Sequence, residues 1–402
     1  MKILQLTHKP PVPCIDGGCQ AMYQITQCLL SAGSEVKVFS VATAKHPVVH
    51  TDDLLKYKEK TKFESIFVDT KVSFGKIVSA FVKKDSLQAY RFFSSEMNEK
   101  LITILAQGTF DVVIVESVFM GHYLETIRKY SLATILLRVH NIEFLIWERL
   151  AKQTKNPYKK VAFRYLSSSL KRFENSLFSK IDGYLPITEV DNQYFKVRYP
   201  NLSSKVISFS IKLSDYNYKE PNFQENNLTF FHLGSMNWQP NIEGMSWFLD
   251  NVWKQAAEKY PHLTFVIAGK GNKEWFAHKS YKNVHIFDFV EDAQQFMNEH
   301  NIMIVPLLSG SGMRIKIIEG MALGKPIITT TIGAEGIEVT HRDNIFIADT
   351  PEEMMQTIGF CVNHTEKCVE IGKNARKLVE EKYTQERVVG ELMEFVNSNL
   401  QQ

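Results

Sequence analysis

Residues 302–328 read IMIVPLLSGSGMRIKIIEGMALGKPII, and this stretch decides the fold class. An apolar run from Ile302 to Leu308 ends in an SGSG turn, and the pattern that follows predicts a helix from Met313 to Leu323. Gly324 stops that helix, and a second apolar run begins at Ile327. Strand, glycine turn, helix and strand form one β-α-β unit, which predicts an α/β protein.

The glycine turn is suited to binding an anion. It places unpaired backbone N–H groups and the positive end of a helix dipole at the carboxyl edge of a parallel sheet. Arg314 and Lys316 add two positive charges, and Glu319 supplies a carboxylate that can accept two hydrogen bonds from the diol of a ribose. These features predict a site for a nucleotide diphosphate. The alternative is a capped surface helix with solvated charges.

The segment from Gly310 to Ile328, followed by GAEG at 333–336, resembles the donor site of family 4 retaining glycosyltransferases. The resemblance extends along nearly the whole chain, and it implies the GT-B fold, with two Rossmann-like β/α/β domains facing across a cleft. Glu319 matches the second Glu of the family's Glu-x7-Glu signature, but Ser311 stands where the first Glu contacts the donor sugar. The chain is therefore similar to a subgroup that carries GSGxRxKxxE. The donor-binding residues implied in this segment are Ser311, Gly312, Met313, Ile315 and Glu319.

Length and composition predict two soluble domains. The chain has 402 residues, of which 44% are hydrophobic and 23% charged, enough for two domains of about 200 residues. Five cysteines without a C-x-x-C pair favour a reducing compartment over a disulfide framework or a zinc site. The first residues fit a short strand rather than a signal peptide, and no apolar window is long enough for a transmembrane helix. We therefore expect a cytoplasmic protein.

Charge is distributed unevenly along the chain. Residues 1–210 hold 29 Lys and Arg against 19 Asp and Glu, whereas residues 211–402 hold 18 against 25. The basic first half predicts an anionic partner, such as a membrane surface, a lipid-linked phosphate acceptor or a nucleic acid. No motif for nucleic-acid binding supports the last of these. We expect peripheral contact with an anionic membrane, on the inner face of the cell membrane.

The chain begins with another β-α-β unit. A strand at Lys2–Leu6 is followed by Gly17 and Gly18, a helix at Gln20–Leu30 and a strand at Glu35–Phe39. The absence of G-x-G-x-x-G argues against a classical dinucleotide site. Both glycines could simply make the turn. The resemblance implies instead that they approach the donor diphosphate.

Two further stretches of the first half are basic. Cations and aromatic residues alternate in residues 71–84 and 88–93, a pattern that can lie on an anionic bilayer but that more often marks a core-facing helix with one solvated side. Residues 144–180 predict a solvated amphipathic helix pair. Between these stretches, the buried strand predicted at Ala133–Val139 ends in His140, at the edge where α/β sites are built. A lone histidine is more often structural, but the resemblance implies that His140 approaches the donor sugar.

Four segments organise the chain. Residues 206–210 are predicted to form the last strand of a first, acceptor-side domain, residues 1–210, and a polar linker follows at 211–226. The second, nucleotide-sugar-binding domain spans residues 227–383. The resemblance implies that a final helix, in segment 384–402, crosses back to the first domain. It also places Gly234, after the strand at residues 228–233, close to the diphosphate.

The expected chemistry needs no metal and no cofactor. The family's Arg and Lys after the first strand of the second domain are missing from residues 234–241, and we expect Arg314 and Lys316 to replace them. No Asp-x-Asp or His/Cys cluster predicts a metal site. His140, Arg314 and Lys316 are therefore the expected catalytic residues of a retaining hexosyltransferase. It would use a UDP- or GDP-sugar and a glycan or lipid-linked acceptor, in bacterial surface polysaccharide synthesis. The alternatives are a catalytically silent nucleotide-sugar-binding subunit and another GT-B enzyme such as a 2-epimerase.

Overall fold

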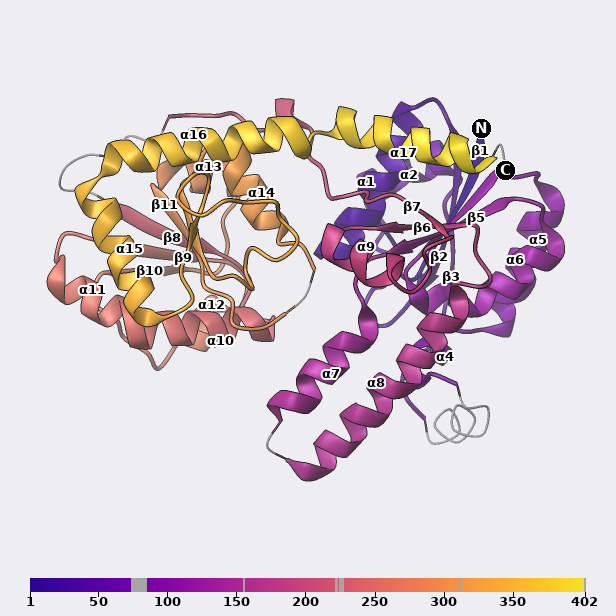
Figure 1. Cartoon of the computed structure of the whole chain (residues 1–402), viewed down its shortest axis with the longest axis horizontal. Helices are drawn as coiled ribbons and strands as arrows, with labels where there is room; N and C mark the ends of the chain where they lie inside the picture. Colours follow the sequence, from indigo (N-terminus) through magenta and orange to yellow (C-terminus); the bar gives the residue numbers. More distant parts are fainter. Residues whose placement is uncertain (74–84, 155, 221–222, 224–227, 311, 401–402) are drawn as a thin grey trace. The chain divides into compact units, whose positions relative to one another are not determined.

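The computed structural model describes residues 1–73, 85–154, 156–220, 223, 228–310 and 312–400. The chain divides into two compact units. The first comprises Met1–Phe209 and Glu386–Gln402, and the second comprises Ser210–Gln385. In each unit helices lie against a sheet of parallel strands (Figure 1), as the α/β pattern predicts.

The first unit contains a seven-stranded parallel sheet with the order β3-β2-β1-β4-β5-β6-β7. Its central strands β4 and β5 are largely apolar and buried, as expected for a parallel sheet with helices on both faces; all five residues of β4 are buried. The strands are β1 (Lys2–Thr7), β2 (Glu35–Ala42), β3 (Glu64–Phe67), β4 (Val112–Glu116), β5 (Thr134–Val139), β6 (Gly183–Pro186) and β7 (Ser203–Ser204).

The helices of the first unit include one from the far end of the chain. Leu392 and Val396 of α17 are fully buried in the same hydrophobic cluster as Ile3 and Leu136. The helices are α1 (Gly17–Ser31), α2 (Asp52–Thr61), α4 (Leu87–Tyr90), α5 (Ser95–Gln107), α6 (Leu124–Tyr130), α7 (Glu143–Gln153), α8 (Pro157–Leu177), α9 (Glu189–Lys196), α17 (Gln385–Leu400) and the 3-10 helix η1 (Val118–Tyr123).

The second unit contains a six-stranded parallel sheet with the order β10-β9-β8-β11-β12-β13. Its strands are β8 (Thr229–Leu233), β9 (Thr264–Ala268), β10 (Val284–Phe287), β11 (Ile302–Val305), β12 (Ile327–Thr329) and β13 (Phe346–Ile347). Its helices are η2 (Leu213–Asp215), α10 (Gln239–Phe248), η3 (Leu249–Trp253), α11 (Lys254–Lys259), α12 (Asn272–Phe276), α13 (Ala293–Glu299), α14 (Ile315–Ala322), α15 (Pro351–Asn363) and α16 (Thr365–Lys382). Of the described helices, none is both long and apolar enough to span a membrane.

The β-α-β unit predicted from residues 302–328 is confirmed as β11, α14 and β12. The helix begins two residues later than expected, because Arg314 has extended backbone angles and occupies the N-cap position. The strand predicted at residues 206–210 is wrong. The ladder beside β6 stops at Ser204, and the chain then continues along β6 with single hydrogen bonds such as Ile207 N to Pro186 O (2.9 Å).

Candidate functional site

The strand order of the second unit reverses direction at β8. β9 and β10 lie on one side of β8, whereas β11, β12 and β13 lie on the other. In open parallel sheets, ligands bind outside the carboxyl ends of the strands at such a switch point. Gly234 follows β8, and the glycine turn follows β11. Both predicted donor segments of this unit therefore lie at the edge where the fold favours a ligand.

Lys316 lies against Gly234 at this switch point. Its Nζ donates a hydrogen bond to Oδ1 of Asn241 in α10 (3.2 Å). A Cβ on Gly234 would lie 2.7 Å from this Nζ and 2.9 Å from Asn241 Nδ2, so only glycine leaves room for the lysine. Burial and the nearby Arg314 charge lower the pKa of Lys316 to about 7. A bound anion would favour the protonated form.

His232 completes this cluster from inside β8. The side chain is fully buried, and its Nδ1 donates a hydrogen bond to the Ile304 carbonyl (2.8 Å). Burial and the Lys316 charge hold the pKa of His232 well below its usual value, so the ring is neutral. Its Nε2 would lie 2.6 Å from a Cβ on Gly234. His232 was not among the predicted site residues, although a histidine inside a buried apolar strand is a signal that the sequence offers.

Arg314 is enclosed by the glycine turn. Its Nη1 donates to the Gly312 carbonyl (2.7 Å), and its guanidinium carbon lies 5.6 Å from the centre of the Trp238 ring. A Cβ on Gly310 would lie 2.6 Å from Arg314 Nη2. The backbone φ is +123° at Gly310 and +79° at Gly312, values that disfavour other residues. The glycines therefore hold Arg314 in place, one residue from Ile315 and two from Lys316.

The amino end of α14 carries three other predicted donor-binding residues, Gly312, Met313 and Ile315, all partly exposed. No described side chain caps this helix. Apart from Ile317 N, which donates to the Arg314 carbonyl (2.9 Å), the first N–H groups of the helix can bind water or an anion. Ser311, the predicted sugar-contacting residue, lies outside the described residues.

Glu319, the predicted ribose ligand, lies one turn further along α14. Its Oε1 accepts a hydrogen bond from the Tyr216 hydroxyl (3.1 Å). Burial and the Glu319 charge raise the pKa of Tyr216, so the tyrosine stays a donor. Tyr216 lies in the segment predicted to be a linker, and the sequence offered no signal for this contact.

Gly17 and Gly18 are the first two residues of α1 in the other unit. Asp16 caps the helix by accepting from Cys19 N (2.9 Å), and both Asp16 oxygens accept from Lys9 Nζ (2.6 and 2.8 Å). Burial opposes ionisation of Asp16, but the Lys9 charge holds its pKa well below its usual value. A Cβ on Gly18 would lie 2.7 Å from Lys9 Nζ. Gly18 thus makes room for a cation beside the helix end.

His140 directly follows β5, and its ring is hydrogen-bonded to a carboxylate of the neighbouring strand. Its Nε2 lies 2.7 Å from Oε2 of Glu116, the last residue of β4, and both side chains are buried. Oε1 of Glu116 accepts from Gln5 Nε2 (2.8 Å), and Arg138 Nε lies 3.6 Å from Oε2. Glu116 therefore orients His140 and also compensates a fully buried arginine.

His8 adds a second imidazole at the same sheet edge. β1, β4 and β5 are neighbours, and their carboxyl ends bring His8, Glu116 and His140 together. The two rings are 5.9 Å apart and nearly perpendicular, and His8 Nδ1 lies 3.2 Å from the Glu116 carbonyl. Burial and the Lys9 charge keep the pKa of His8 well below its usual value. Polar residues at the ends of buried strands were the signal in the sequence that could have identified this cluster.

Glu143, three residues after His140, opens α7. Burial raises its pKa to about 7, while a hydrogen bond from Asn141 Nδ2 (3.3 Å) opposes that shift. The carboxyl group can therefore gain or lose a proton near neutral pH, which is the property of an acid or base.

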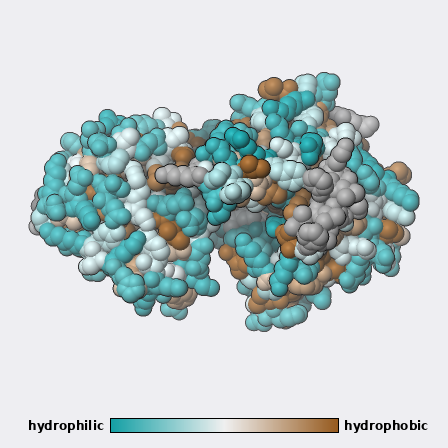
Figure 2. Space-filling model, turned by 90° about the horizontal axis from the view of Figure 1, so that it is seen from below, coloured by the Kyte–Doolittle hydropathy of each residue, from teal (hydrophilic) through white to brown (hydrophobic). Residues whose placement is uncertain are grey.

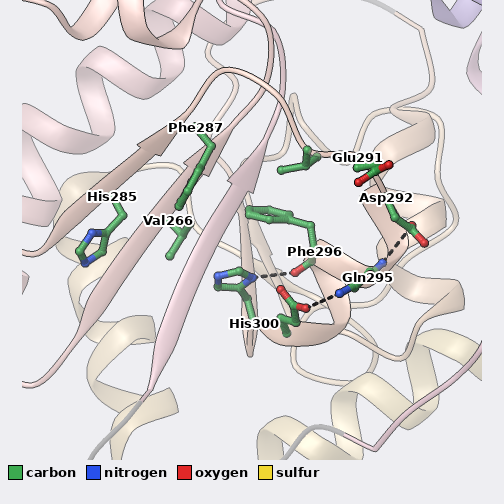
Figure 3. Close-up of a pocket in the computed structure, with 10 residues that line it drawn as sticks. Val266, His285, Phe287, Glu291, Asp292, Gln295, Phe296 and His300 are labelled. Carbon is green, nitrogen blue, oxygen red and sulfur yellow. Dashed lines mark hydrogen bonds between the residues drawn. The ribbon is translucent and has the colours of Figure 1, made fainter.

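A pocket of about 490 Å³ lies elsewhere in the second unit. Figure 3 shows Val266 and Phe287 on the strands, opposite Phe296 and His300, with Glu291 and Asp292 at one end. None of the predicted donor residues lines this pocket. Nowhere among the described residues do three His, Cys, Asp or Glu side chains gather closely enough to hold a metal ion.

Sequence comparisons find one family model that matches the second unit and two relatives of the chain. Residues 227–364 match the family model described as Glycosyl transferases group 1. A Klebsiella pneumoniae protein, described as an uncharacterized 44.6 kDa protein in the cps region, is 23% identical over 96% of this chain and 97% of its own length. A Haemophilus influenzae protein, described as an uncharacterized glycosyltransferase, is 27% identical over 36% of this chain and 43% of its own.

Structural comparisons confirm the predicted GT-B fold. HepE from Anabaena, solved in complex with UDP, aligns with a TM-score of 0.68 and 14% identity over 99% of this chain and 100% of its own. Sucrose-phosphate synthase from Thermosynechococcus elongatus aligns with a TM-score of 0.69 and 13% identity over 99% of each chain. Together with the family match, the fold supports a glycosyltransferase of the group 1 type.

Proposed function

We propose that the chain transfers a hexose from a UDP- or GDP-sugar to a glycan or lipid-linked acceptor, with retention of the anomeric configuration and without a metal ion. The observation that carries this proposal is the pair of cations, Arg314 and Lys316, at the glycine turn of the unit that matches the family. The solved complexes of HepE with UDP and UDP-glucose support a nucleotide-sugar donor.

In this reaction the bond between the sugar C1 and the phosphate oxygen breaks, and negative charge develops on the leaving diphosphate. Fixed charges and N–H groups aimed at that oxygen lower the barrier. We assign this role to Arg314, Lys316 and the amides at the start of α14, with Gly234 leaving room for the phosphates. Glu319 accepts hydrogen bonds from the ribose.

Residues of both units are assigned to the sugar and the phosphates. We assign His140 of the first unit and the segment around Ser311 of the second to orientation of the hexose, and Gly17 and Gly18 to close approach of backbone to phosphate. The acceptor hydroxyl forms its bond to C1 on the face that the diphosphate leaves. Its proton passes to the leaving phosphate oxygen, so no protein nucleophile is needed.

The setting we propose is bacterial surface polysaccharide synthesis, in the cytoplasm and in peripheral contact with the cell membrane. The relative from a cps region supports it. Residues 71–84, for which a bilayer contact was the less favoured of two interpretations, lie largely outside the described residues.

A thermal-shift screen against UDP- and GDP-sugars, followed by turnover assays, tests the proposal. We expect one donor to stabilise the protein and to be consumed, with Arg314→Ala and Lys316→Ala abolishing consumption. A donor that binds but is neither hydrolysed nor transferred would indicate a silent subunit. Conversion of the donor to its 2-epimer would indicate an epimerase.

A further inference from the structure

Helices α7 and α8 form a hairpin that extends away from the sheet of the first unit (Figure 1). The two helices pack through one face of each. The rings of Trp147 and Phe163 are 5.7 Å apart, and Ser167 Oγ donates to the Phe144 carbonyl (3.0 Å). Leu170 continues this inner face and is fully buried. The hairpin is therefore already stabilised by its inner face.

The amino-terminal part of α8 nevertheless exposes a second apolar face. Tyr158 is 85% exposed, Val161 68% and Tyr165 43%. Their spacing of three and four residues places them in one row, on a side of the helix different from that of Phe163 and Ser167. The space-filling view shows a mostly hydrophilic face with scattered brown apolar side chains (Figure 2). An exposed apolar row on a helix that already packs through another face points to a partner.

The same end of the hairpin is strongly basic. Residues 149–165 contain six Lys and Arg and no Asp or Glu. At about 100° per residue, Lys159 lies on one side of the apolar row and Arg164 on the other. In the described part of the chain, neither these two nor Lys160 forms an ion pair with a carboxylate. We call Tyr158, Lys159, Lys160, Val161, Arg164 and Tyr165 the hairpin tip.

The tip is preformed. Asn156 Oδ1 caps α8 by accepting from Tyr158 N (3.0 Å) and Lys159 N (3.1 Å), and Pro157 occupies the first turn. These are strong helix-start signals. The row of apolar side chains is therefore presented without a folding cost on binding.

We propose that the hairpin tip binds the surface of an anionic lipid bilayer. Its chemistry has two parts: tyrosines and a valine that enter the headgroup region, and cations that meet acidic headgroups. An acidic protein or a nucleic acid would satisfy the cations but would leave the apolar row in water. This inference rests on the proposed function, in which the first unit meets an anionic membrane, and it names the surface that does so.

Vesicle co-sedimentation of the full chain tests the proposal. We expect binding to vesicles of equal parts phosphatidylcholine and phosphatidylglycerol, and little binding to phosphatidylcholine alone. Lys159→Glu with Lys160→Glu should weaken binding at least about tenfold, since each cation near the surface contributes about fivefold and two are lost. Tyr158→Ser with Val161→Ser and Tyr165→Ser should weaken it to a similar extent, and most visibly at high salt, where the charged contribution is screened.

The matched control is Lys58→Glu with Lys60→Glu. These two lysines are exposed on α2 of the same unit and undergo the same charge change. The control should bind vesicles like the unaltered chain. Equal weakening by the control would show that only net charge matters and would overturn the proposal, as would normal binding by both tip variants.

Donor-induced thermal stabilisation, measured on the same variants, separates this proposal from the function on which it rests. The tip variants should keep the stabilisation that the donor gives the unaltered chain. If vesicles bind through the hairpin tip but no nucleotide sugar is consumed, the proposed function is wrong, and the proposal that the tip binds membranes is kept. If the protein consumes a nucleotide sugar but does not bind vesicles, the assignment of the hairpin tip to membrane binding is wrong. It is also wrong if the tip substitutions dissociate a dimer instead of weakening vesicle binding.

Discussion

The Nε2 atom of His140 lies 2.7 Å from Oε2 of Glu116, although the two residues are 24 positions apart in the chain. Parallel pairing of β4 and β5 places Glu116 opposite Arg138, and His140 follows two residues later on the same face. The carboxylate accepts from the Nε2–H group, which fixes the orientation of the ring. His140 Nδ1 is then the ring nitrogen that remains for a substrate.

Replacing Glu116 by Gln should slow the reaction without unfolding the protein. We expect kcat to fall about tenfold to a hundredfold, the range found when a partner that orients a histidine is lost, with KM little changed. Steady-state kinetics of Glu116→Gln, His140→Ala and the double variant test whether Glu116 acts through His140. If Glu116 acts through His140, the double variant should be no slower than His140→Ala alone. Additive losses would contradict a positioning role.

The same substitution should lower stability, because it leaves the buried charge of Arg138 uncompensated. Breaking a buried pair costs about 3–5 kcal/mol, whereas replacing both partners by apolar groups is often neutral. The double variant Glu116→Gln with Arg138→Met should therefore recover most of the free energy of unfolding, but its kcat should stay low. Urea unfolding followed by circular dichroism measures the free energy of unfolding. Recovery of kcat in the double variant would mean that the slow rate came from misfolding.

Substituting Arg314 or Lys316 by Ala should cost about a hundredfold to a thousandfold in kcat each, the range for loss of one group that stabilises developing charge. The exposed Lys282, in the same unit, is the matched control, and its change to Ala should leave kcat unaltered. Thermal unfolding confirms that each variant is folded. A loss below threefold in both site variants would remove these residues from the chemistry.

Donor affinity should depend on pH through Lys316. The pKa of this residue is lowered to about 7 in the free protein, first by burial and then by Arg314, and a bound diphosphate raises it again. Below pH 7 the lysine is already charged and affinity is maximal. Above pH 7 binding must take up a proton, so affinity falls about tenfold per pH unit until the pKa of the complex is reached.

Isothermal titration calorimetry, in two buffers that differ in ionisation enthalpy, counts the proton taken up. Lys316→Arg keeps its charge over this range, because the guanidinium pKa is far higher. The variant should show an affinity that does not change with pH. Equal pH dependence in both proteins would assign the proton to another group.

Glu319 should recognise the ribose of the donor. Glu319→Ala should weaken binding of a ribonucleoside diphosphate about tenfold to a hundredfold, because hydrogen bonds to a charged group contribute about 1.5–3 kcal/mol. The Glu319→Ala variant should also bind ribonucleotides and deoxyribonucleotides equally, whereas the unaltered protein should prefer the ribonucleotide. Tyr216→Phe is the control for the bond that Glu319 already makes, and it should keep this preference. A preference that survives in Glu319→Ala would place the ribose elsewhere.

Sequence patterns located the elements of the donor segment because those signals are local. The apolar runs, the glycine turn and the helix stop around α14 all lie within residues 302–328. Capping decided the errors at helix ends: Asp16 starts α1 three residues earlier than periodicity suggested. Arg314, as the N-cap, starts α14 later.

The partners of the candidate site could not be predicted in the same way. Tyr216 and Glu319 are 103 positions apart, and Lys316 and Asn241 are 75 apart. Such contacts depend on strand order, and an order such as β1-β4-β5 does not follow from the strands one by one. A polar residue at the end of a buried strand, as at Glu116, marks a position of interest but does not name its partner.

Proton NMR of the reaction in progress tests the central claim, retaining transfer from a nucleotide sugar, most directly. The donor found by thermal shift is incubated with the protein, and the anomeric signal of the transferred or released hexose is followed from the first minutes. We expect the configuration of the donor to be kept in the unaltered protein, and no new signal with Arg314→Ala. An initial product of opposite configuration would contradict the retaining assignment.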